Sequence, residues 1–284
     1  MTKTASLTRP TNARDLPAAL EEARVLIVED NAVNMEVASF HLEDLGCVTT
    51  CVTNGALAVE AYTSRAFDYV LMDCQMPVLN GYQALAQIRA FEVAAKRPAV
   101  IVIAVTAADD TDSQIRCADA GFDGFLAKPF TSAQLKSAMQ NPFATRVSAD
   151  GSASGTPVVS EFKTLPILDT TAFEAFVSEF GFEVAQSLLG SFVKSLGDCK
   201  ARFLRACGTK DTAELQALAH KIAGAAGTVG AARVATQARA LEGACKRGQF
   251  KWTPAIALFG GALDDAIEAF QPFTHPGAFE PRPV

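Results

Sequence analysis

The chain has 284 residues, enough for two domains, and its 49% hydrophobic and 20% charged content is typical of globular proteins rather than disordered ones. The net charge of −6 comes without a run of lysine and arginine, so neither nucleic acid nor an anionic membrane surface is an expected partner. The sequence shows no membrane-spanning stretch and no signal peptide, and its seven scattered cysteines form no zinc or disulfide pattern. We therefore expect a cytoplasmic protein with reduced thiols and no direct membrane insertion.

Short apolar runs alternate with helical patterns between Arg24 and about Gln140. The expected strands are Arg24–Val28, Cys47–Val52, Asp68–Met72, Val100–Val105 and Gly124–Leu126. Helical spacing of apolar residues marks, among others, Asn34–Leu45, Ala56–Ser64 and Gly81–Phe91. This alternation predicts a flavodoxin-like α/β domain at residues 23–140, in which a doubly wound, five-stranded parallel sheet is covered by helices on both faces.

The second half of the chain has no strand signal. Residues 141–166 are rich in Ser, Gly, Thr, Ala and Pro, which predicts a flexible linker. The expected helices are Thr171–Phe180, Val184–Cys207, Asp211–Thr228, Ala231–Arg247 and Thr253–Phe270. They predict an all-α antiparallel bundle at residues 167–272. Residues 1–22 are left as an N-terminal extension and residues 273–284 as an irregular tail.

Polar residues follow four of the five predicted strands. Glu29 and Asp30 follow the first strand, Asp73 the third, Thr106 the fourth and Lys128 the fifth. The carboxyl ends of parallel strands share one edge of the sheet, so these side chains should converge. Three close carboxylates would repel one another, and Mg²⁺ would relieve that repulsion. Asp73 could then act as a nucleophile toward phosphorus, with Lys128 balancing charge and Thr106 donating a hydrogen bond to a phosphoryl oxygen.

Each of these residues also has a purely structural interpretation. An acid after a strand is often a turn former, and Asp30 could be the N-cap of the next helix. Lys128 could be a surface lysine before a helix, because Thr131 and Gln134 form a capping box. The convergence of all five side chains favours a site over five independent structural roles.

Four motifs resemble the receiver domain of two-component response regulators over about residues 23–140. They are V-L-I-V-E-D at 25–30 with Asn31 and Asn34, L-M-D-C-Q-M-P-V-L-N-G at 71–81, V-T-A at 105–107, and L-A-K-P-F at 126–130. The resemblance implies that Asp73 is the phosphoacceptor and that Thr106 and Lys128 contact the phosphoryl group. It also implies Mg²⁺ ligation by Asp30, Asp73 and the Gln75 backbone carbonyl, with Glu29 acting largely through water. Phe125 matches an aromatic switch position, with ordinary core packing as the alternative.

His220 stands out in the predicted bundle. On a helical wheel, Leu215, Leu218 and Ile222 lie on the core face and His220 points away from it. We therefore expect an exposed imidazole, beside which Gly224 and Gly227 leave room for a partner surface. Asp211 and Glu214 predict a capping box at the helix start. His41 and His275 are interpreted as solvent-facing residues without a role.

The stretch L-A-H-K-I-A-G-A-A-G-T-V-G-A at 218–231 resembles histidine-containing phosphotransfer (HPt) domains over roughly residues 167–270. The resemblance implies that His220 is a second phosphoacceptor, on a surface that includes Lys221, Gly224 and Gly227. The family often has a lysine three positions after the histidine, and this chain has Ala223 there. Lys221 lies about 100° away from His220 around the helix, so it replaces that lysine only imperfectly.

Together the two resemblances imply a phosphorelay protein, similar to the C-terminal half of hybrid sensor kinases. No glycine-rich ATP motif is present, so at most slow autophosphatase activity is expected. Asp73 would accept the phosphoryl group from a sensor histidine kinase, possibly a hybrid one, and His220 would pass it to a downstream response regulator. The alternatives are a binding regulator controlled by phosphorylation of Asp73, a sink that drains a partner receiver through His220, and a metal-dependent phosphatase.

Overall fold

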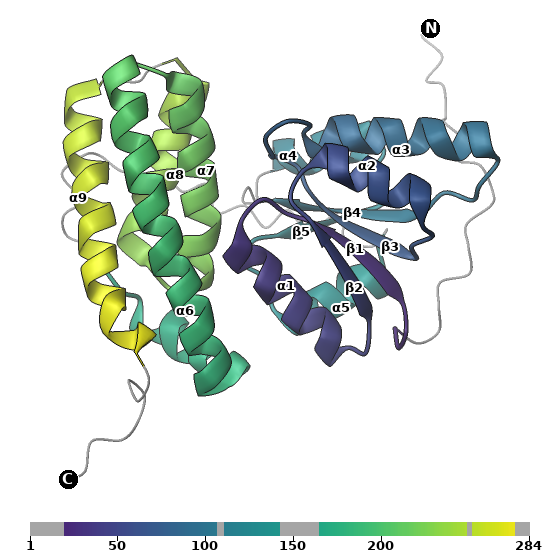
Figure 1. Cartoon of the computed structure of the whole chain (residues 1–284), viewed down its shortest axis with the longest axis horizontal. Helices are drawn as coiled ribbons and strands as arrows, with labels where there is room; N and C mark the ends of the chain where they lie inside the picture. The colour runs from purple at the N-terminus through teal and green to yellow at the C-terminus, as the bar shows by residue number, and fades with distance from the viewer. Residues whose placement is uncertain (1–19, 107–110, 143–164, 249–251, 276–284) are drawn as a thin grey trace, which may run out of the picture.

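The computed structural model describes residues 20–106, 111–142, 165–248 and 252–275. Most of the predicted N-terminal extension and linker, the end of the predicted tail, and Ala107 of the V-T-A motif lie outside these residues. Figure 1 shows two lobes, an α/β lobe formed by the first half of the chain and a helical bundle formed by the second. Among the described helices, none is both long and apolar enough to cross a bilayer.

The sheet of the α/β lobe has five parallel strands in the order β2-β1-β3-β4-β5. The strands are β1 (Arg24–Val28), β2 (Val48–Val52), β3 (Tyr69–Asp73), β4 (Ile101–Thr106) and β5 (Gly124–Ala127). Each boundary lies within one residue of the predicted one, so the predicted fold class is confirmed for this lobe. Because Val28 pairs with Met72 and Asp73 with Val105, the carboxyl ends of β1, β3 and β4 lie side by side.

Helices cover both faces of the sheet. They are α1 (Ala32–Asp44), α2 (Gly55–Ser64), α3 (Gly81–Ala95), α4 (Thr111–Ala120) and α5 (Ser132–Gln140). Successive strand residues point to opposite faces, so Val25 and Ile27 pack with α1 and α5, whereas Leu26 and Val28 pack with α2, α3 and α4. The predicted capping box of α5 is present, whereas α1 is capped by Asn31 rather than by Asp30.

The bundle contains α6 (Thr170–Thr209), α7 (Thr212–Thr228), α8 (Ala232–Lys246) and α9 (Trp252–Phe270), followed by the 3₁₀ helix η2 (Gln271–Thr274). The first two predicted helices form one element, α6, interrupted at Gly181, where φ is 72° and ψ is 166°. A left-handed φ of this kind favours glycine. Asp211 caps α7 as predicted, but the Glu214 carboxylate accepts a hydrogen bond from Arg202 instead of completing the box.

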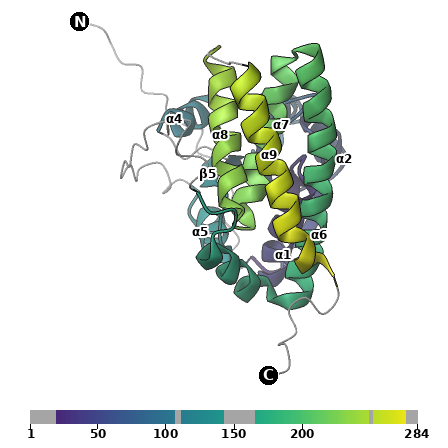
Figure 2. The ribbon, with the colours of Figure 1, turned by 90° about the vertical axis from the view of Figure 1, so that its left-hand side faces the viewer.

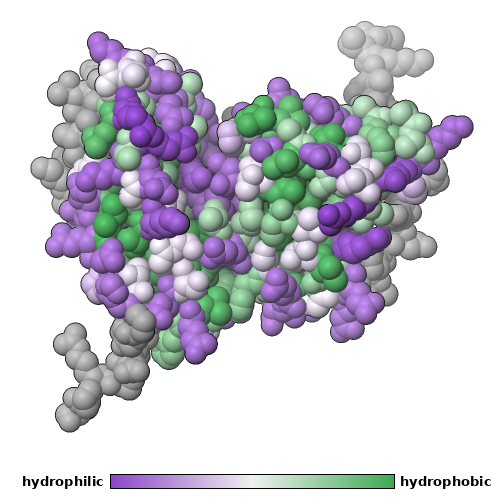
Figure 3. Space-filling model, in the orientation of Figure 1, coloured by the Kyte–Doolittle hydropathy of each residue, from purple (hydrophilic) through white to green (hydrophobic). Residues whose placement is uncertain are grey.

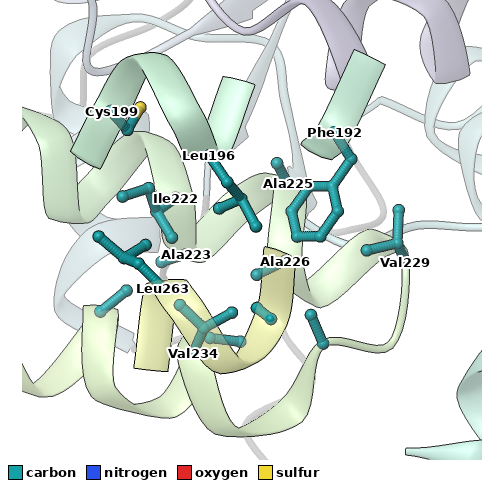
Figure 4. Packing of buried hydrophobic residues seen from close by; sticks show 14 of the residues in the cluster. Phe192, Leu196, Cys199, Ile222, Ala223, Ala225, Ala226, Val229, Val234 and Leu263 are labelled. Carbon is teal, nitrogen blue, oxygen red and sulfur yellow. The ribbon is translucent and has the colours of Figure 1, made fainter. Parts of the chain in front are cut away.

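The bundle core is built from aliphatic and aromatic side chains of all four helices. Figure 4 shows Phe192 and Leu196 of α6 facing Ile222 of α7, Val234 of α8 and Leu263 of α9. Small residues of α7, which include Ala223, Ala225 and Ala226, are also fully enclosed. They let α7 approach its neighbours closely, so the helix that carries His220 is held rigidly by its apolar side.

The two lobes are packed against each other through α1, α6 and α7. Val33 and Val37 of α1 belong to the same apolar cluster as the bundle core, and the Phe40 ring lies 4.9 Å from that of Phe180 in α6. Figure 2 shows the bundle in front of the α/β lobe. On the face shown in Figure 3, a groove of about 750 Å³ with polar and charged walls, among them Glu36 and Lys194, runs beside this contact.

His41 lies in the same contact, which corrects the sequence-based interpretation of it as a solvent-facing residue. Its side chain is buried, with the ring 5.2 Å from that of Phe180 and 6.0 Å from that of Phe130. Burial lowers the pKa of His41 below its ordinary value, and the opposing charges of Glu179 and Asp44 do not reverse the effect. The packing of α6 over α1, which sequence periodicity does not reveal, is the reason for this burial.

Candidate functional site

Three carboxylates converge at the carboxyl edge of the sheet. Glu29 and Asp30 follow β1 and Asp73 ends β3, and one oxygen atom from each lies within 4.8 Å of the others. Asp73 is fully buried and Glu29 nearly so. The order of the strands, with β1 next to β3, is what brings together residues that are more than forty positions apart.

Lys128 supplies positive charge to this cluster. Its Nζ atom donates hydrogen bonds to Asp73 Oδ2, at 2.7 Å, and to Glu29. Burial alone would lower the pKa of Lys128, but the carboxylates of Asp73 and Glu29 outweigh it and hold that pKa above its ordinary value. Lys128 is therefore a permanently charged cation and not a surface lysine.

One lysine does not neutralise the three acids. Burial raises the pKa of Glu29 to about 7, and the charge of Asp73 adds to this effect while Lys128 opposes it. Burial likewise raises the pKa of Asp30. Carboxylate oxygens that crowd together in this way are the donor set that suits a hard divalent cation. The acidic cluster therefore fits Mg²⁺.

The other predicted residues of this lobe lie around the cluster. Thr106 is buried at the end of β4, and its carbonyl oxygen accepts a hydrogen bond from Lys128 N at 2.8 Å. Gln75 follows β3 and its N–H donates to Asp73 Oδ1 at 2.9 Å. Phe125 in β5 is partly buried against the apolar cluster that packs with α2, α3 and α4.

His220 of α7 faces the acidic cluster across the contact between the lobes. Its Nε2 atom lies 4.0 Å from Asp73 Oδ1. The prediction of an exposed histidine is wrong for this arrangement, because the α/β lobe covers the imidazole and leaves His220 7% exposed. The structure thus brings the two predicted acceptor residues, 147 positions apart in the sequence, almost into contact.

Glu242 of α8 is a residue of the site that sequence reasoning missed. Its Oε1 atom lies 3.1 Å from His220 Nδ1 and also accepts a bond from Lys246 at 2.6 Å. Burial opposes the charged imidazole, but the hydrogen bond to Glu242 and the charge of Asp73 raise the pKa of His220 above its ordinary value. One feature of the sequence could have identified this residue. Glu242 is an acid on the buried face of its helix, which it shares with Ala235 and Ala238.

The two glycines near His220 lie at the contact between the lobes. A Cβ atom on Gly224 would come within 3.0 Å of Asn34 Nδ2, and one on Gly227 within 3.6 Å of Pro129 Cδ. Lys221 reaches across to the carbonyl oxygen of Asp30, at 2.9 Å. Ala223 is buried inside the bundle.

A cavity of about 330 Å³ opens beside the Asp73–His220 pair. Asp30, Gln75 and Asn80 line it from the α/β lobe, and Gln216 and His220 from α7. Asp30 and the loop after β3 are therefore reachable by small solutes while the lobes are packed together.

Comparison with known proteins identifies both lobes. The family model of the response regulator receiver domain matches residues 25–140, and the model of the Hpt domain matches residues 187–272. The sensory/regulatory protein RpfC of Xanthomonas campestris pv. campestris is 28% identical over 223 residues, which cover 77% of this chain and 30% of RpfC. The sensor protein GacS of Pseudomonas syringae is 37% identical over 119 residues, 42% of this chain and 13% of GacS.

Other relatives match less than half of the chain. The peroxide stress-activated histidine kinase mak1 of Schizosaccharomyces pombe is 35% identical over 136 residues, 46% of this chain and 8% of mak1. The solved receiver domain of the sensor histidine kinase PA1611 from Pseudomonas aeruginosa is 38% identical to this chain. That structure holds a magnesium ion in its active-site cleft. The match covers 43% of this chain and 98% of that one, with a TM-score of 0.39. The chain spans less than a third of the length of the curated relatives it matches. It belongs to the two-component signalling proteins, as a response regulator receiver domain followed by an Hpt domain.

Proposed function

We propose that this chain is a phosphorelay intermediate that moves a phosphoryl group between Asp73 and His220 within one molecule. The observation that carries the proposal is the 4.0 Å approach of His220 Nε2 to Asp73 Oδ1 in a contact that encloses both residues. A histidine that served only external partners would not need to lie against this carboxylate.

The bond from Nδ1 to Glu242 prepares the imidazole for transfer. When Nδ1 carries the proton and donates a hydrogen bond to Glu242, Nε2 is left with a free lone pair on the side of the ring that faces Asp73. In the transfer step, Nε2 attacks the phosphorus atom of the aspartyl phosphate, the P–Oδ bond breaks, and Asp73 regains its carboxylate. The charge that develops on the imidazole is balanced by Glu242, which burial and hydrogen bonding hold in place.

The receiver side supplies the charges that a phosphoryl group requires. Lys128 would neutralise the leaving carboxylate, and Thr106, at the end of β4, would donate to a phosphoryl oxygen. Asp30, Asp73 and the Gln75 carbonyl would hold Mg²⁺, with Glu29 acting through water. The bound ion would screen the negative charge of the phosphoryl group as it approaches the carboxylates.

The partners follow from the two acceptor chemistries. A phosphohistidine on a sensor histidine kinase is the donor for Asp73, and the aspartate of a downstream response regulator is the acceptor from His220. This order resembles the arrangement of receiver and Hpt domains expected at the end of hybrid kinases. The opposite order, in which His220 drains a foreign receiver and Asp73 hydrolyses the group, uses the same residues.

The test uses purified protein, Mg²⁺ and radiolabelled acetyl phosphate, and compares the wild type with Asp73→Ala and His220→Ala. Label is sorted into base-labile aspartyl phosphate and acid-labile phosphohistidine. We expect acid-labile label in the wild type and none in Asp73→Ala, with base-labile label persisting in His220→Ala. Phosphohistidine that forms equally well in Asp73→Ala, or label confined to Asp73 in the wild type, would refute the internal relay.

A further inference from the structure

Asn31 uses its one side-chain amide for two contacts. Its Oδ1 atom accepts hydrogen bonds from the N–H groups of Val33, at 3.0 Å, and Asn34, at 3.4 Å, which caps α1. Its Nδ2 atom points the other way and donates to the backbone carbonyl of Lys221 in α7, at 3.0 Å. The cap needs an acceptor and the α7 carbonyl needs a donor, so both neighbours require the same orientation of the amide.

Lys221 makes a second hydrogen bond between the same two segments. Its Nζ atom donates to the backbone carbonyl of Asp30, at 2.9 Å, and lies 3.8 Å from the Asp30 carboxylate. Residues 30–31 of the receiver and residue 221 of the bundle therefore exchange two hydrogen bonds. Asp30 belongs to the acidic cluster and Lys221 directly follows His220, so these bonds join the chain segments next to the two acceptors.

The other contacts between the lobes are less directional. Val33, Val37 and Phe40 pack on the bundle through apolar surface, which tolerates small sliding movements. The bonds from Ser191 to Glu36 and from Ser132 to Glu179 lie at the exposed edges of the contact. Asn31, by contrast, is 1% exposed, so the loss of its donor would leave a buried carbonyl without that partner.

We propose that Asn31 is a positioning residue that fixes how the bundle is aligned on the receiver. This inference rests on the proposed transfer between Asp73 and His220. The Asn31 amide recognises the carbonyl of Lys221, and this contact holds His220 Nε2 opposite Asp73 Oδ1. We expect the Asn31 side chain to take no part in the phosphorylation of Asp73 by a small molecule, because its amide bonds backbone groups of α1 and α7. The backbone N–H of Asn31 donates to Glu29 Oε1 at 3.2 Å, and a side-chain substitution retains that donor.

The contact also defines the kind of receiver that the bundle accepts. The carbonyl of Lys221 is a hydrogen-bond acceptor, so it fits a receiver with a side-chain amide at the position after the acidic pair. A carboxylate at that position would cap its helix equally well, yet it would place an acceptor against an acceptor. A downstream response regulator served by His220 should therefore carry a side-chain donor there.

Two substitutions separate the cap from the docking contact. Asn31→Asp keeps the capping oxygen and the shape but removes the donor, and Asn31→Ser keeps a capping oxygen without adding charge. Asn54→Asp is the matched control, because Asn54 caps α2 through the N–H of Leu57 and lies outside the contact. Thermal unfolding of each variant verifies that the fold is retained.

Two rates are measured at saturating Mg²⁺. Labelling of Asp73 by acetyl phosphate, followed in a His220→Gln background, should stay within about twofold of the parent in all three variants. Single-turnover appearance of phosphohistidine should fall about tenfold or more in Asn31→Asp, fall less in Asn31→Ser, and stay unchanged in Asn54→Asp.

The outcomes are distinguishable from failure of the relay itself. A wild type that never forms phosphohistidine would refute the proposed function. A wild type that does so, with both Asn31 variants transferring at its rate, would refute the role of Asn31 alone. Parallel losses of Asp73 labelling and transfer would show that Asn31 acts on the acidic cluster, which would also overturn the inference.

Discussion

The two proposed acceptor sites are built on different principles. Asp73 stands at the end of a central strand, among charged groups that neighbouring strand ends bring together. His220 stands in the middle of a helix, and its chemistry depends on Glu242 from α8 and on the receiver packed against it. The first site is complete within its own lobe, whereas the second is completed only by contact with another. Function should therefore respond differently to substitutions at the two sites.

The largest expected effect is the loss of Lys128. Lys128→Met removes the cation that joins Asp73 and Glu29 and leaves their charges without compensation, so labelling of Asp73 by acetyl phosphate should fall about 100-fold. Lys136→Met, on the exposed side of α5, is the control and should label normally. A loss of less than threefold in Lys128→Met would mean that the receiver site does not depend on its internal charge balance.

Substitution of Glu242 should affect only the second site. In Glu242→Ala the imidazole loses the acceptor that orients Nδ1, so transfer to His220 should slow about tenfold or more while labelling of Asp73 is unchanged. Glu242→Gln retains an acceptor and should lose less. Glu268→Ala, an exposed acid on α9, serves as the control. Equal rates in Glu242→Ala and the control would show that the receiver alone orients His220.

The smallest expected effect concerns His41, between the lobes. Burial lowers its pKa in the folded protein, so the unfolded chain, with a histidine pKa of about 6.5, binds more protons as the pH falls below that value. The free energy of unfolding should therefore decrease from pH 7 to pH 5 by about 1 kcal/mol more in the wild type than in His41→Phe. Urea titrations of the full chain at both pH values measure this difference. Identical decreases would mean that His41 titrates normally in the folded state.

Sequence patterns predicted the receiver better than the bundle site for a physical reason. In a parallel sheet, each buried strand is an apolar run and its carboxyl end meets the others at one edge, so Asp30, Asp73 and Lys128 could be brought together before the structure was known. The helices of the bundle were also predicted, because apolar residues recur at helical spacing. The interruption around Gly181 was predicted as a gap between two helices, but their union in a single element, α6, was not, since a lone glycine does not distinguish a kink from a loop.

Contacts between elements were the part that periodicity could not supply. Helical spacing assigns a face to His220 but does not say what covers that face, so its burial and its approach to Asp73 were missed. The same holds for His41, whose burial depends on α6 of the other lobe. Glu242 lies 22 positions from His220 on another helix, and its contact with His220 can be recognised only when α7 and α8 are packed side by side.

The burial of Asp73 and His220 has a consequence for the proposed relay. In the packed arrangement Asp73 is 1% exposed and His220 7% exposed, so no second protein can reach either residue. Under the proposed function, every exchange with a kinase or a downstream regulator would require a separate, opened arrangement of the same chain. Receipt, internal transfer and delivery would then be successive events that exclude one another in time. A phosphoryl group in the packed state would be insulated from unrelated receivers and from phosphatases, and the rate at which the lobes separate would set an upper limit on the flow of signal through the chain.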